Sequence, residues 1–180
     1  MQKFKLSANL GFLFNDVDLP EAIAQSAEAG FSSVECQNPY ALPAAKFRRA
    51  CEQAGLPLIA INTRRGIPGQ FGLNAVPEFK REARNAIEEA IDYAAEAGAG
   101  YVHLVSGISE GEAAFDMLCE NIAYAISRLT ATNVQILLEP INTNTVPGFY
   151  LSSPERALAV INAVGSDKVG MLFDCFHMLH

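Results

Sequence analysis

Short apolar runs alternate with longer segments of helical periodicity along the whole sequence. The apolar runs are rich in β-branched residues and predict strands at 4–9, 33–37, 57–62, 101–106, 134–139 and 169–174. Between them, apolar positions recur every three or four residues, as in amphipathic helices, and predict helices at 20–29, 43–54, 78–97, 115–129 and 154–164. A chain that alternates strand and helix in this way forms a parallel sheet.

Residues at the expected helix ends agree with this pattern. Asp18 with Glu21, and Ser152 with Glu155, have the spacing of a capping box at a helix start. Glycine follows each of four helices, where a left-handed residue closes the last turn; these are Gly30, Gly55, Gly98 and Gly165. Because linkers and low-complexity tracts are absent, we predict a single domain over residues 1–180.

Two parallel architectures compete, a doubly wound open sheet and a closed (β/α)8 barrel. No G-x-G-x-x-G motif follows the first strand and no P-loop is present, which removes support for a nucleotide-binding open sheet. Polar residues instead mark the carboxyl end of nearly every strand, where a barrel has its active site; they are Asn9, Glu35, Gln37, Asn62, Ser106, Glu139 and Asp174. We therefore predict a TIM barrel.

Two acidic residues at this rim predict a metal site. Glu139 ends an apolar strand, where a carboxylate is costly unless it is paired or bound to a metal. A salt bridge to a neighbouring strand is the alternative for Glu139, and a helix N-cap is the alternative for Asp174 on the next strand. Together the two carboxylates suit a hard divalent cation, Mg2+ or Mn2+.

Other polar residues are candidates for substrate binding. His177 stands three residues after Asp174 and can reach the substrate if the chain turns there. His103 either points into the site or packs as a core histidine. A long loop at 63–77 carries several glycines, and loops of this length in compact domains are usually functional.

Composition narrows the classes of partner. A formal charge of -7 without basic runs argues against nucleic acid, and no apolar run approaches the roughly 20 residues of a membrane span. Four scattered cysteines without a C-x-x-C pair predict neither disulfides nor a zinc knuckle, so we expect a reducing, cytoplasmic location. Homo-oligomer formation is left open.

A series of short motifs covers essentially the whole chain in order. Together they resemble the hydroxypyruvate isomerase family, part of the xylose isomerase-like barrel superfamily. The motifs are Ala8-Asn9-Leu10 with Phe14, Val34-Glu35, Pro39-Tyr40, Asn62-Thr63, Gly72-Leu73 with Val76-Pro77, Val102-His103, Glu139-Pro140-Ile141-Asn142 and Phe173-Asp174-Cys175-Phe176-His177.

The resemblance implies a role for several of these residues. Glu139 and Asp174 would bind the divalent metal, Glu139 would also act as a catalytic proton carrier, and His177 would contact substrate oxygens. The reaction implied is the interconversion of hydroxypyruvate, a small hydroxy-carbonyl compound, and tartronate semialdehyde through an enediolate. Apart from the resemblance, His103 and Arg65 are also candidates for substrate binding.

The long loop departs from the family pattern, since it carries Arg64 and Arg65 where the family usually has uncharged residues. Our hypothesis is that one of them pairs with the substrate carboxylate through two parallel hydrogen bonds. The alternative is that both arginines are solvated loop residues.

The length also departs from the family, since barrels of this type run to about 250 residues. The resemblance places further metal ligands and a second catalytic glutamate beyond His180, so we expect the chain to lack the C-terminal quarter of the barrel and to be inactive alone. Three alternatives remain: a ketose 3-epimerase or other sugar isomerase of the same superfamily, a noncatalytic binding protein, and a distant endonuclease IV-like enzyme. The last needs a histidine-rich zinc cluster, and the sequence has three histidines.

Overall fold

The computed structural model describes residues 4–129 and 132–179, so His180 lies outside the described residues. The elements in chain order are β1 (Ser7–Asn9), α1 (Leu19–Glu28), β2 (Ser33–Cys36), α2 (Ala44–Ala54), β3 (Leu58–Asn62), the 3-10 helix η1 (Pro77–Phe79), α3 (Lys80–Ala97), β4 (Tyr101–His103), α4 (Gly111–Arg128), β5 (Gln135–Leu138), α5 (Pro154–Val164), β6 (Val169–Met171) and α6 (Cys175–Met178). Every strand and helix predicted from the sequence is present.

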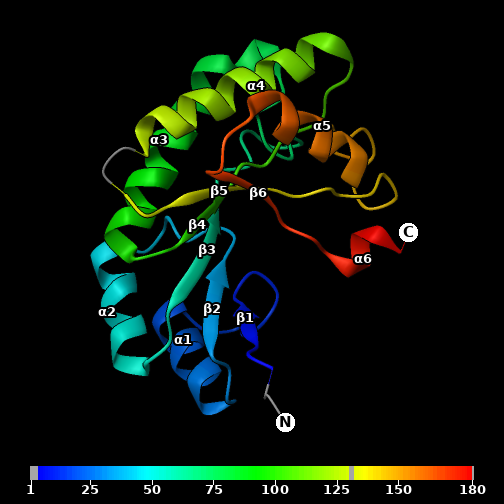
Figure 1. Ribbon diagram of the computed structural model, residues 1–180. Helices are drawn as coiled ribbons and strands as arrows, with labels where there is room; N and C mark the ends of the chain where they lie inside the picture. The colour runs from blue at the N-terminus through cyan, green and yellow to red at the C-terminus, as the bar shows by residue number, and fades with distance from the viewer. Residues whose placement is uncertain (1–3, 130–131, 180) are drawn as a thin grey trace.

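The strands form one parallel sheet in the order β1-β2-β3-β4-β5-β6. Helices α1 to α5 follow one another around its outer side, each packed on the next (Figure 1). Within the described ranges, β1 and β6 each pair with one neighbour, so the sheet is that of a (β/α) barrel left open between these two strands. The predicted barrel architecture is thus confirmed for six strands.

Small side chains bring the helices close to the sheet. Helix α3 buries a stripe of alanines and isoleucines, which are Ala83, Ala86, Ile87, Ala90, Ile91, Ala94 and Ala97. Strand residues such as Val102 and Ile136 are fully buried beneath the helices. Burial of such side chains contributes about 1.5–3 kcal/mol each and supplies the main stabilisation of the fold. No helix in the described part of the chain is long and apolar enough to cross a bilayer.

Element ends differ from the predictions in a few places. Strand β4 ends at His103 rather than at 106, and β6 ends at Met171 rather than at 174, because the residues beyond them turn into loops that line or support the rim. Helix α5 is capped by Ser153, whose Oγ accepts a hydrogen bond from Arg156 N at 3.3 Å, so the predicted cap at Ser152 was wrong by one residue. The expected cap at Asp18 is confirmed.

The long loop between β3 and η1 is anchored at its base. Gly72 forms an isolated bridge with Ser106, and the buried Asn74 amide donates to Val105 O at 2.9 Å and to Thr63 Oγ1 at 3.2 Å. Asn121 of α4 donates to Asn74 O at 2.9 Å. The start and end of the loop are therefore fixed, while residues 64–71 project between them.

Candidate metal and substrate site

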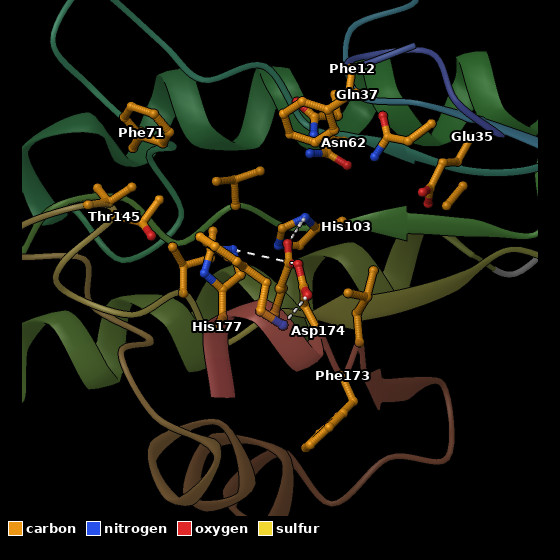
Figure 2. A pocket seen from close by; sticks show the side chains of 18 of the residues that line it. Phe12, Glu35, Gln37, Asn62, Phe71, His103, Thr145, Phe173, Asp174 and His177 are labelled. Carbon is orange, nitrogen blue, oxygen red and sulfur yellow. Dashed lines mark hydrogen bonds and ion pairs between the residues drawn. The ribbon is translucent and has the colours of Figure 1, made fainter. Parts of the chain in front are cut away.

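A cavity of about 820 Å3 opens at the carboxyl ends of the strands (Figure 2). Each strand contributes a lining residue at or just after its end; these are Asn9, Glu35, Asn62, His103, Glu139 and Asp174. Ser106 was expected at this rim but is fully buried in the bridge to Gly72 and does not line the cavity. The other polar residues predicted at the strand ends line the cavity, as expected.

Three of the lining residues form a compact cluster. Glu139, Asp174 and His177 each offer a ligand atom, and these atoms lie within 4.8 Å of one another. Glu139 directly follows β5, Asp174 lies between β6 and α6, and His177 belongs to α6. Asp174 Oδ1 accepts a hydrogen bond from Phe176 N at 2.8 Å, while Oδ2 lies 3.8 Å from His177 Nε2. Asp174 thus caps α6 with one oxygen and faces the cluster with the other.

Burial leaves the acidic groups of the cavity short of compensating charge. Burial, with the nearby charges of Asp174 and Glu35, raises the pKa of Glu139 to about 7. Burial also raises the pKa of Glu35, although a hydrogen bond from Asn9 opposes the shift. A cation placed among these carboxylates would favour their ionised forms.

The cluster fits a divalent cation. The two carboxylates supply oxygen donors that Mg2+ and Mn2+ favour, and the imidazole of His177 lies beside them. Hard divalent cations bond oxygen at about 2.0–2.6 Å, so the ligand atoms of one shared cation lie within about 4–5 Å of one another. The separations among Glu139, Asp174 and His177 lie within that limit.

His103 combines the two alternatives considered for it. Its side chain is buried, yet it lines the cavity, and Nδ1 lies 3.5 Å from Glu139 Oε2. Burial, assisted by the charge of Arg65, lowers the pKa of His103 to about 4. The imidazole is therefore neutral near pH 7, and its approach to Glu139 is a polar contact rather than an ion pair. Nε2 is buried without a hydrogen-bond partner among the described residues.

A neighbouring amide sets the orientation of His177. Asn142 Oδ1 accepts hydrogen bonds from Thr145 N at 2.9 Å and Thr145 Oγ1 at 3.1 Å, and a backbone N–H can only donate. The amide is thereby fixed so that Asn142 Nδ2 lies 3.1 Å from His177 Nδ1 and donates to it. A neutral imidazole that accepts at Nδ1 carries its proton on Nε2, the atom that faces Asp174.

The two loop arginines have different environments. Arg64 donates from Nε and Nη2 to Glu89 of α3, at 2.6 and 2.8 Å, and does not line the cavity. Arg65 lines the cavity beside Gln37 and Phe71. The structure therefore leaves Arg65 as the candidate for the substrate carboxylate.

Two contributors to the site had no role in the sequence interpretation. Asn142 was part of a motif without an assigned function, and Phe71 was not singled out at all. Asn142 could have been found by its position, since it is a polar residue that follows the end of β5 by four residues, close to the rim. No periodicity marks Phe71, because it lies in an irregular loop.

Comparison with known proteins identifies the family. Residues 23–180 match the family model described as Xylose isomerase-like TIM barrel. The chain belongs to this family. Among curated relatives, the putative hydroxypyruvate isomerase of Homo sapiens is 35% identical over 192 residues, covering 98% of this chain and 68% of the human protein. The 2-oxo-tetronate isomerase of Cupriavidus necator is 31% identical over 179 residues, covering 96% of this chain and 69% of that protein.

A solved structure extends the same likeness to the fold. The crystal structure described as AP endonuclease, family 2, from Brucella melitensis has a TM-score of 0.91 and 30% sequence identity, covering 96% of this chain and 69% of that one. These matches confirm the family resemblance and the barrel fold predicted from the sequence. They also confirm that the chain belongs to an isomerase family, since its curated relatives are named isomerases. The chain spans about two thirds of the length of these relatives.

Proposed function

We propose that this protein is a metal-dependent isomerase that interconverts hydroxypyruvate and tartronate semialdehyde. The observation that carries the proposal is the cluster of Glu139, Asp174 and His177, whose ligand atoms lie within 4.8 Å of one another in a cavity at the strand ends. The name of the human relative, putative hydroxypyruvate isomerase, supports the choice of substrate.

The reaction moves a proton between adjacent carbons, so it needs a group that takes and returns a proton near neutral pH. Glu139 is the candidate for this role because its carboxylate lines the cavity beside Asp174 and His177. Glu139 and Asp174 would hold a divalent cation, which would supply positive charge opposite the negative charge that develops on the substrate oxygens. His177 Nε2–H is placed to donate a hydrogen bond to one of those oxygens.

A second substrate candidate is a four-carbon keto acid. The Cupriavidus necator relative, 31% identical, is named a 2-oxo-tetronate isomerase, and a cavity of about 820 Å3 has room for more than three carbons. Assays of hydroxypyruvate, 2-oxo-tetronate and free ketoses side by side separate these substrates from those of a sugar epimerase.

An endonuclease function has less support, although the Brucella structure is described as an AP endonuclease. Three carboxylates line the cavity, at Glu35, Glu139 and Asp174, and the whole chain has a formal charge of -7. A phosphate backbone requires positive charge instead.

Titration with Mn2+ tests the metal site. We expect Glu139→Gln and Asp174→Asn each to weaken Mn2+ binding by about tenfold or more, because each removes an anionic ligand. Isothermal titration calorimetry on the purified chain measures the affinity.

Glu35→Gln is the matched control, since it neutralises a carboxylate of the same cavity that lies outside the cluster. We expect a clearly smaller loss of affinity there. Equal losses at all three positions, or no binding by the unaltered chain, would contradict the proposed site. Turnover of hydroxypyruvate is assayed in parallel on the chain alone and on the chain joined to the remaining third of the human relative.

A further inference from the structure

Two consecutive arginines of the long loop point to different partners. The guanidinium of Arg64 pairs with both carboxylate oxygens of Glu89 and lies 4.4 Å from the centre of the Tyr40 ring. These contacts hold the loop against α3. Arg64 is therefore a structural residue, and its donors are directed away from the cavity.

Arg65 is held at the cavity by uncharged partners. Its guanidinium lies 4.7 Å from the centre of the Phe71 ring, and Nη2 donates to Gln37 Oε1 at 2.9 Å. Stacking on an aromatic ring and a side-chain amide fix the position of a guanidinium without neutralising it. Among the described residues, no carboxylate lies within ion-pair distance of Arg65. Its remaining N–H donors are available to a ligand.

The charge of Arg65 is isolated in an acidic cavity. Of the described residues that line it, Arg65 is the sole arginine or lysine, and Glu35, Glu139 and Asp174 are all acidic. Gln37 and Phe71, which hold Arg65, lie across the cavity from Asp174 and His177 (Figure 2). An anionic group entering this cavity is therefore attracted to Arg65 and repelled by the carboxylates of Glu35, Glu139 and Asp174.

We propose that Arg65, stacked on Phe71 and oriented by Gln37, is the specificity-determining residue of this site and selects substrates that carry a carboxylate. The inference rests on the proposed function, because it assumes that the hydroxyl and carbonyl end of the substrate occupies the Glu139–Asp174–His177 cluster. A planar guanidinium binds a carboxylate through two parallel hydrogen bonds, whereas a neutral hydroxymethyl group offers neither the charge nor that geometry. Arg65 thereby favours carboxylate-bearing substrates over neutral ketoses, because a ketose gains no binding free energy from the guanidinium.

Two small ligands that differ at one position test the proposal. Hydroxypyruvate carries a carboxylate where dihydroxyacetone carries a hydroxymethyl group, and both have the same hydroxyl and carbonyl groups. Calorimetry on the Mn2+-loaded chain of 180 residues gives a Kd for each ligand. We expect Arg65→Met to raise the Kd of hydroxypyruvate about tenfold or more and to leave that of dihydroxyacetone within about twofold. Arg65→Lys should recover part of the loss, because it keeps the charge without the paired geometry.

Arg48→Met is the control, because it removes the same kind of side chain from an exposed ion pair with Glu52 on α2, outside both the loop and the cavity lining. It should leave the ratio of the two Kd values unchanged. An unchanged ratio in Arg65→Met, or an equal change in Arg48→Met, overturns the inference and leaves the proposed function standing. If the unaltered chain binds no Mn2+ but the ratio of the two Kd values still depends on Arg65, the proposed metal site fails while carboxylate selection by Arg65 stands. Binding of neither ligand by the unaltered chain overturns both.

Discussion

The imidazole of His177 is oriented by an amide that is itself held by the backbone. Thr145 N donates to Asn142 Oδ1 at 2.9 Å, which leaves Asn142 Nδ2 to donate to His177 Nδ1. The proton of the neutral imidazole therefore lies on Nε2, beside Asp174. A single backbone N–H thus decides which face of His177 can donate to a ligand.

Replacing that amide by a carboxylate should reverse the tautomer. In Asn142→Asp, one oxygen still accepts from Thr145 N, and the other accepts from His177 Nδ1 in place of donating to it. We expect the Nε2–H tautomer to give way to the Nδ1–H tautomer, as measured by 15N chemical shifts of the imidazole nitrogens.

Asn144→Asp provides the control, because it makes the same chemical change at an exposed position two residues away. It should leave the tautomer of His177 as it is. The orientation argument is wrong if both variants, or neither, shift the nitrogen resonances.

Some features of the site could be predicted from the sequence at the level of single residues, and others could not. Glu139 and Asp174 could be predicted as neighbours because parallel strands of one sheet present their carboxyl ends at one edge. The choice between Arg64 and Arg65 could not be made, since consecutive residues in an irregular loop follow no period that fixes which one faces the cavity. The partner of Asn142 depended on how the loop after β5 folds back, which local sequence does not specify.

At the scale of elements, the base of the long loop depends on close backbone contact. Gly72 has φ of +100°, and a Cβ built there would lie 2.2 Å from Val105 O. A side chain at this position strains the backbone and collides with a carbonyl that cannot move without disturbing the rim. The bridge between Gly72 and Ser106 therefore requires glycine.

Gly72→Ala should lower the free energy of unfolding by roughly 3 kcal/mol or more, because steric overlap adds to the cost of a left-handed backbone. Gly69→Ala separates the two effects: Gly69 has φ of +88°, yet nothing lies within 4 Å of its Cβ position. We expect a loss of only about 1 kcal/mol there. Urea unfolding monitored by circular dichroism measures both, and equal losses would refute the close contact.

Strands and helices were predictable as elements because their periods extend over many residues, whereas their ends were less so. Strand β4 ends at His103 because the chain then turns to carry Ser106 into its bridge with Gly72, a long-range contact. Helix α6, Cys175–Met178, was not predicted, since one turn is too short to show a period. Tertiary contacts, absent from any local pattern, fix these boundaries.

For the whole molecule, the acidic cavity predicts that a cation stabilises the fold. A ligand that binds only the folded state adds about 2.7 kcal/mol at a hundredfold excess over its Kd. For a chain of this size, that corresponds to a rise in Tm of about 5–10 °C. We expect Mn2+ to produce this rise in differential scanning calorimetry, and Na+ at matched ionic strength to produce none.

Two substitutions test whether the rise originates at the site. Glu139→Gln should abolish most of it, because a ligand of the proposed cation is lost. Glu52→Gln, which removes an exposed carboxylate paired with Arg48, should retain it. A rise that survives in Glu139→Gln would place the stabilising ion elsewhere on the surface.

The anchoring of the long loop at its base has a consequence for how the molecule can diversify. Backbone contacts around Gly72 and the buried amide of Asn74 hold the base of the loop, whereas Arg65 and Phe71 in the segment above it line the cavity. Mutations in that segment can change ligand preference without disturbing the sheet or the cluster beneath it. With the roles proposed above, selectivity and chemistry are encoded in separate stretches of the chain, so one can drift during evolution while the other is preserved.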